Sequence, residues 1–148
     1  MRLTAFTDFA LRAMMRLAGE PERSFTTGEI AREFAISRHH LTKVVRNLSA
    51  AGFVATQRGS RGGFRLARAA EAISIGEIVR ALEARHALVE CFRDDGGTCV
   101  LTPRCRLKNR LADAREAFLR ELEKTSLAEC AYPGRMTARG TVAANRRR

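Results

Sequence analysis

Residues 37–66 read SRHHLTKVVRNLSAAGFVATQRGSRGGFRL, and this stretch decides the fold. Its first part carries apolar residues at the spacing of a helix, namely Leu41, Val44, Val45 and Leu48. Gly52 is placed to end that helix at the position after the C-cap. Residues 53–57 and 63–66 then flank a basic segment rich in glycine, which predicts a β-hairpin. A helix followed by a basic hairpin is the second half of a winged helix-turn-helix.

The residues before this stretch predict two further helices. Apolar residues recur with a helical period over residues 4–18, and Gly19 and Pro21 end that pattern. Thr26 or Thr27 is placed to cap a short second helix, with an acid in its first turn, and Ser37 is placed to cap the third. The order of elements predicts a mainly α fold with a small β-hairpin wing, which is a winged helix-turn-helix plus one long helix.

The residues after the hairpin predict that long helix and a loop before it. The sequence Ser74-Ile75-Gly76-Glu77 is a capping box that opens a fourth helix. A helix from about Cys105 to Lys124 carries an apolar stripe and is about 30 Å long. So small a domain covers only part of such a helix, which suggests dimerisation. We therefore expect a DNA-binding domain at 1–84, a cysteine loop with a dimerisation helix at 85–130, and a basic disordered tail at 131–148.

The positive charge of the chain lies at its two ends. The net charge is +11, of which residues 1–66 carry +6 and residues 131–148, with five arginines and no acid, carry +5. This pattern fits a polyanion such as DNA, although charge alone is also consistent with a role in solubility. Neither an apolar run of membrane-spanning length nor a signal peptide is present, so we expect a cytoplasmic protein with no membrane partner.

The third helix and the hairpin are the candidate DNA-reading elements. The outward face of the helix carries polar and cationic side chains suited to base edges and phosphates, namely Arg38, His39, His40, Thr42, Lys43 and Arg46. The hairpin tip carries Arg58 and Arg61 between glycines, which suits a narrow minor groove. Each feature is also compatible with a solvated surface, but their order along the chain favours binding of double-stranded DNA.

Three of the four cysteines form the motif Cys91-x₇-Cys99-x₅-Cys105. This spacing differs from that of zinc fingers, and the segment contains no histidine. Three thiolates from one loop can hold three corners of an iron–sulfur cluster, with the last ligand coming from elsewhere. A thiol–disulfide switch remains the alternative. Cys130 lies beyond the long helix, and we expect it to take no part in the site.

Several segments of the chain resemble the Rrf-type family of bacterial winged-helix regulators. These are residues 1–12, the run Ser37-Arg38-His39-His40-Leu41-Thr42-Lys43, the glycine-rich wing, residues 75–83 and residues 103–108. The resemblance spans about residues 1–130. It implies a homodimer with an iron–sulfur cluster in each subunit, attack on that cluster by nitric oxide, and a consequent fall in DNA affinity. It also implies that Asp8 of the partner subunit completes the ligands Cys91, Cys99 and Cys105.

The resulting expectation is a transcriptional repressor that senses nitric oxide through a 4Fe–4S cluster, or alternatively a 2Fe–2S cluster. A regulator of iron availability with the same cofactor and a thiol redox switch without a cluster are the alternatives. Family members that regulate cluster homeostasis have a histidine three residues after the last cysteine, where this chain has Lys108. No Ser/His/Asp set or phosphate-binding loop is present, so the sequence does not predict an enzyme.

Overall fold

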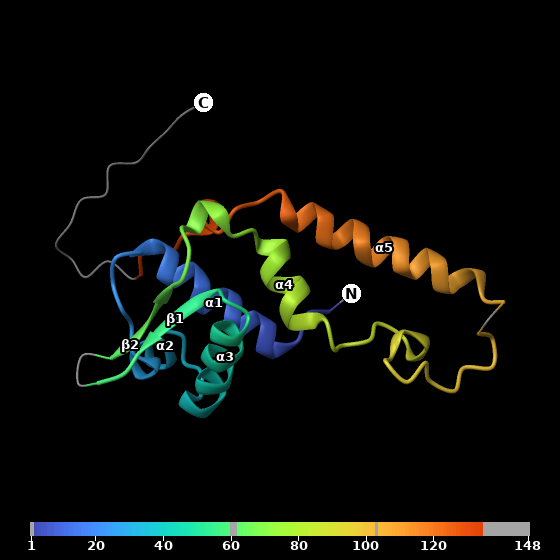
Figure 1. The fold of residues 1–148 in the computed structure, drawn as a ribbon, viewed down its shortest axis with the longest axis horizontal. Helices are drawn as coiled ribbons and strands as arrows, with labels where there is room; N and C mark the ends of the chain where they lie inside the picture. The colour runs from blue at the N-terminus through green and yellow to red at the C-terminus, as the bar shows by residue number, and fades with distance from the viewer. Residues whose placement is uncertain (1, 60–61, 103, 135–148) are drawn as a thin grey trace.

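The computed structural model describes residues 2–59, 62–102 and 104–134. Five helices and one hairpin follow one another in the order α1 Ala5–Gly19, α2 Thr27–Glu33, α3 Arg38–Ala50, β1 Val54–Gln57, β2 Gly63–Leu66, α4 Ile75–Glu83 and α5 Arg106–Glu123. Short 3₁₀ turns lie at Ala70–Ala72, Glu90–Phe92 and Ala128–Cys130. Figure 1 shows the first three helices and the hairpin gathered together, with α5 running away from them beyond α4. The predicted winged helix-turn-helix with a long additional helix is confirmed.

Side-chain caps set where most of the helices begin. Thr26 accepts from the Glu29 amide at 3.2 Å, and the Glu29 carboxylate accepts from the Thr26 amide at 2.7 Å, which completes a capping box at α2. Ser74 accepts from the amide of Glu77 at 3.0 Å and caps α4. Ser37 stands at the N-cap of α3, but the prediction that its side chain caps the helix is wrong. The first turn of α3 is closed instead by the backbone carbonyl of Ser37, which accepts a hydrogen bond from the Leu41 amide at 3.0 Å.

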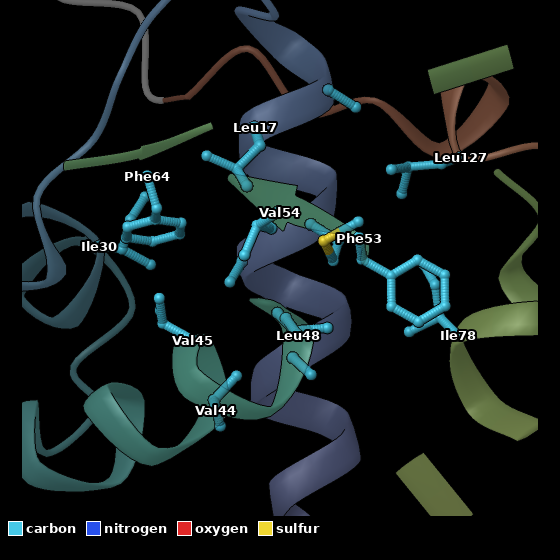
Figure 2. Packing of buried hydrophobic residues seen from close by; sticks show 14 of the residues in the cluster. Leu17, Ile30, Val44, Val45, Leu48, Phe53, Val54, Phe64, Ile78 and Leu127 are labelled. Carbon is cyan, nitrogen blue, oxygen red and sulfur yellow. The ribbon is translucent and has the colours of Figure 1, made fainter. Parts of the chain in front are cut away.

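The core joins the wing to the helices (Figure 2). Phe53 and Phe64 bring one buried ring from each side of the hairpin, and α1 passes between the side chains of the hairpin, α3 and α4. The backbone of Phe64 also pairs with Phe25 in both directions, at 2.9 and 2.8 Å. The strands are antiparallel with Thr56 opposite Phe64. The hairpin is therefore held by its own core residues in a defined position beside α3.

The long helix α5 packs through a narrow contact with α4. Its one buried residue is Leu119, and Gly76 of α4 lies so close to the backbone of α5 that a Cβ would overlap Glu123. Arg80 of α4 reaches across to Glu116 and Glu123, at 2.7 Å in each case. Leu107 and Phe118 remain 61% and 36% exposed on the other side of α5. Among the described residues, no helix is both long and apolar enough to cross a membrane.

The chain after α5 returns to the winged helix-turn-helix. Leu127 is fully buried and donates its amide to the Ile73 carbonyl at 2.7 Å. Tyr132 then donates its amide to the carbonyl of Met15, in α1, at 2.8 Å. The packed part of the chain thus continues to Gly134, past the predicted start of the tail at residue 131. Residues 135–148 lie outside the described residues.

Candidate nucleic-acid interface and cysteine segment

The outer face of α3 is polar and open to solvent. The residues predicted to read DNA are all exposed, namely Arg38, His39, His40, Thr42, Lys43 and Arg46. The opposite face of the helix is buried in the core through its four aliphatic residues. Because the two faces are so sharply separated, α3 can only present its cationic face outward. Whether these side chains contact bases or phosphates stays a prediction.

Local contacts restrain two side chains on this face of α3, Thr42 and His40. The Thr42 hydroxyl donates to the Arg38 carbonyl at 2.8 Å, so its methyl group and the acceptor capacity of its oxygen are left for a partner. The His40 ring stacks on Phe9 of α1, with ring centroids 6.4 Å apart and planes at 26°. The sequence did not single out His40 as a partner of Phe9, because the two residues belong to different helices. His40 thereby connects the exposed face of α3 to α1.

The wing lies beside α3 rather than away from it. A hollow of about 330 Å³ is lined jointly by α2, α3 and the hairpin, including Thr27, Arg38 and Gln57. Arg58 is exposed in the described part of the wing, whereas Arg61, predicted as its second DNA contact, lies outside the described residues. Helix α3 and the root of the wing therefore open onto one continuous surface.

Removing a cation from α3 is expected to weaken DNA binding. Arg38→Ala or Lys43→Ala should each cost about 1–3 kcal/mol if the side chain reads a base. The matched control is Arg120→Ala, an exposed arginine on α5. Binding isotherms on a specific and a scrambled duplex would measure the difference. Equal affinities for both α3 variants and wild type would mean that another surface reads the DNA.

Glu83 is a buried carboxylate that sequence reasoning missed. It lies at the end of α4, yet it accepts hydrogen bonds at the start of α1 from the Thr4 amide at 2.9 Å, the Thr4 hydroxyl at 2.8 Å and the Thr7 hydroxyl at 2.5 Å. His86 Nδ1 is 3.6 Å from its other oxygen. Glu83 therefore joins the beginning of α1, where Asp8 lies, to the point where the cysteine segment leaves α4.

These contacts predict an acid-sensitive link. Burial raises the pKa of Glu83, but hydrogen bonds from Thr7 and Thr4, together with nearby His86, outweigh burial and hold the pKa below its usual range. The stabilisation is present above the unfolded value of about 4.3 and is lost as pH falls through the folded pKa.

Glu83→Ala should lower the free energy of unfolding by about 1–3 kcal/mol at neutral pH, because it leaves buried donors unpaired. It should also reduce the loss of stability on acidification. Urea unfolding across pH would measure both effects, with exposed Glu71→Ala as the control. If Glu83→Ala and Glu71→Ala gave the same pH profile, Glu83 would have no such role.

The three clustered cysteines lie in and beside one loop between α4 and α5. Cys91 is in a 3₁₀ turn, Cys99 is in the loop, and Cys105 is the N-cap of α5. All are half-buried free thiols. Within the described ranges, no three Cys, His, Asp or Glu side chains are close enough to hold a metal ion. The structure thus places the three cysteines in one segment without bringing their sulfur atoms to a common centre.

The chemistry of these donors suits an iron–sulfur cluster. Thiolates are the usual protein ligands of such clusters, and the segment offers three cysteine side chains. The loop itself is shaped by Glu90, which accepts from the Thr98 amide at 2.9 Å and hydroxyl at 2.7 Å, and by Gly96 and Gly97 at positive φ. The three thiols therefore have the chemistry that an iron–sulfur cluster requires. To bind the cluster, the loop must change conformation so that the three sulfur atoms come together.

Asp8, predicted as the ligand from the partner subunit, lies in the first turn of α1. Its carboxylate is half-exposed and pairs with Arg12 at 2.6 Å. Cys130 lies at the other end of α5, half-buried against the core. The geometry thus separates Cys130 from the cysteine loop and leaves Asp8 accessible at the surface.

Comparison with known proteins places this architecture in a family. A model of the Rrf2 family, described as "Iron-dependent Transcriptional regulator", matches residues 3–132. The chain belongs to the Rrf2 family. It is 46% identical over 130 residues to the HTH-type transcriptional regulator NsrR of Geobacillus kaustophilus, covering 87% of this chain and 88% of that protein.

Solved structures agree with this assignment. CymR, the global cysteine regulator of B. subtilis, superposes with a TM-score of 0.70 at 29% identity, covering 88% of this chain and 96% of that one. IscR of T. potens superposes with a TM-score of 0.66 at 24% identity, covering 87% and 85%, which concerns the fold alone. This Rrf2 protein is therefore a DNA-binding transcription regulator and not an enzyme, as predicted.

Proposed function

We propose that this Rrf2 protein is a repressor whose affinity for DNA depends on an iron–sulfur cluster, held by Cys91, Cys99 and Cys105, that nitric oxide destroys. The observation that carries the proposal is the set of three free thiols gathered between α4 and α5. The 46% identity to a protein named NsrR supports this choice of signal. We expect the protein to act in the cytoplasm, where its DNA partner would lie.

The exposed side of α5 supports a homodimer. Apolar residues line a hollow of about 440 Å³ between α5 and the chain leaving α4, including Leu88, Leu111 and Phe118. Leu107 extends this apolar surface toward the start of the helix. Removing such an apolar face from water is energetically favourable, and α5 of a second subunit offers a complementary apolar surface. Two reading helices would then be held together for two half-sites of DNA.

A 4Fe–4S cluster, when bound, supplies iron that reacts with nitric oxide; a 2Fe–2S cluster is the alternative cofactor. The three cysteines provide three thiolates, and the partner's Asp8 provides the remaining ligand in the proposed dimer. Asp8 lies in the first turn of α1, close to Thr4 and Thr7, which Glu83 binds. Release of the cysteine segment would therefore disturb the start of α1, which contacts the reading helix through Phe9 and His40.

The description of the family as iron-dependent favours a second candidate, a repressor that responds to iron availability through the same thiols. A thiol redox switch without a cluster is the third candidate. The three differ in what they require. Only the first two need bound iron, and only the third responds, through its DNA affinity, to a thiol oxidant in protein that contains no iron.

An anaerobic titration with nitric oxide tests the proposal. Visible absorption and DNA binding are followed in the same samples, for wild type and for Asp8→Ala. Loss of the cluster absorption should be matched by a fall in DNA affinity, and Asp8→Ala should bind an altered cluster that responds differently. Constant DNA affinity after the cluster is destroyed would contradict the proposal. If Asp8→Ala behaved like wild type, Asp8 would not be a ligand.

A further inference from the structure

A hollow of about 460 Å³ lies between the 3₁₀ turn that carries Cys91 and the helices α4 and α5. Its volume is within the range of ligand pockets, which is about 300–1,000 Å³. The wall comes from all three elements and includes Arg80, Cys91, Phe92, Lys108, Arg115 and Glu116. Neither Cys99 nor Cys105 lines this hollow. The half-buried thiol of Cys91 therefore has surroundings that the other two clustered cysteines do not share.

The wall of this hollow is positively charged. Three cationic side chains and one carboxylate line it, so its net charge is +2. The carboxylate of Glu116 is already paired with Arg80, at 2.7 Å. Among the described residues, no carboxylate lies within 4 Å of the charged groups of Lys108 or Arg115. These two cations are therefore free to bind the carboxylates of a small anion.

The cationic surface continues beyond Arg115. Arg115 also borders an adjoining hollow of about 340 Å³, whose wall includes Arg2 and His86. The one carboxylate in that wall, Glu83, is buried and already accepts three hydrogen bonds from the start of α1. A ligand with two anionic groups would thus find cations both beside Cys91 and farther along the same cleft.

We propose that this hollow binds an anionic disulfide of low molecular weight, and that Cys91 of the iron-free protein exchanges with it to form a mixed disulfide. Lys108 and Arg115 bind the carboxylates of the small molecule and hold its S–S bond beside Cys91. The Cys91 thiol loses its proton to solvent, and its thiolate attacks one sulfur of the disulfide. The S–S bond of the small molecule breaks as the new S–S bond forms, and the other half leaves as a thiolate that takes up a proton. The small disulfide is thus the oxidant, and one of its halves is reduced to a thiol.

The mixed disulfide would prevent Cys91 from acting as a cluster ligand. This consequence rests on the proposed function, whereas the exchange itself does not. The modification is reversible, because a small thiol can attack the mixed disulfide and release Cys91. Cys91 would therefore be protected while the protein lacks iron, and cluster assembly would wait until small thiols are again in excess.

Initial rates of reaction with two small disulfides test the charge preference. Dithiodiglycolate carries two carboxylates, whereas cystamine carries two amines. Mass spectrometry of peptides from iron-free protein gives the rate at Cys91 relative to Cys99, which cancels the intrinsic reactivity of each disulfide. At low salt this ratio should be about tenfold higher for dithiodiglycolate than for cystamine, and the difference should shrink as salt is added. The same ratio for both disulfides would overturn the proposal.

A pair of matched variants tests the residues. Lys108→Gln/Arg115→Gln should abolish most of the preference of Cys91 for dithiodiglycolate. The control Arg110→Gln/Arg120→Gln removes the same charge from exposed positions of α5 and should keep the preference. A change in the thiolate fraction of Cys91 would alter both disulfide reactions alike, so the preference itself reports binding. An equal loss in both variants, or no loss in either, would contradict the assignment of Lys108 and Arg115.

Iron uptake by modified and unmodified protein separates this inference from the proposed function. Protein with a mixed disulfide at Cys91 should take up no cluster until a small thiol is added. Equal uptake by modified and unmodified protein would show that the modification does not block assembly. If unmodified protein took up no iron at all, the proposed cluster would be wrong, while selective exchange at Cys91 would still support the anion site.

Discussion

Replacement of Cys91, Cys99 or Cys105 by alanine is expected to yield protein without bound iron, whereas Cys130→Ala is expected to keep it. Each of the first three supplies one of only three thiolates in the cysteine segment, so a single loss leaves too few ligands. Cys130 lies at the opposite end of α5 from Cys105, and a helix of this length separates them by about 27 Å. Its half-buried position against the core gives it a packing role.

The measurement is the iron and sulfide content of the four variants after anaerobic purification, together with visible absorption. Circular dichroism provides the control for folding, because all four positions are half-buried. Normal iron in Cys99→Ala would remove that residue from the proposed ligands. Loss of iron in Cys130→Ala, with folding intact, would require a different set of cysteines.

Phe64→Ala is expected to cost about 3–5 kcal/mol in the free energy of unfolding, because a large buried ring is removed and a cavity remains. Phe64 is 2% exposed, and its backbone pairs with Phe25 while its strand pairs with β1. The same ring fixes the hairpin beside α3, so DNA binding should fall even below the unfolding temperature. Urea unfolding and DNA binding at low temperature would measure the two effects separately.

Phe64→Leu is the matched control, since it keeps most of the buried volume. It should lose much less stability than Phe64→Ala and retain DNA binding. If both variants unfolded at the same urea concentration, the ring would not be a core anchor. If Phe64→Ala bound DNA like wild type under folding conditions, the position of the wing would not matter for binding.

The elements of the DNA-binding part could be predicted from the sequence, because their signals are local. The aliphatic spacing at 41–48, the left-handed position of Gly52 at φ +77° and the Thr26–Glu29 capping box each involve residues within a few positions of one another. Exposure of the cationic face of α3 follows from burial of the opposite face. The exposed cationic face of α3 was therefore foreseeable, except for the contact of His40 with Phe9, which joins two helices.

The tertiary structure alone decided the connections between distant segments. The sequence determined that three thiols share one loop and that basic charge lies at both ends of the chain. Only the fold showed that Glu83 binds the start of α1, and that Tyr132 returns to Met15 and Phe34. Such contacts leave no periodic pattern in the sequence. Each one depends on the path that the chain takes once α4 and α5 have packed together, and not on the residues next to it in sequence.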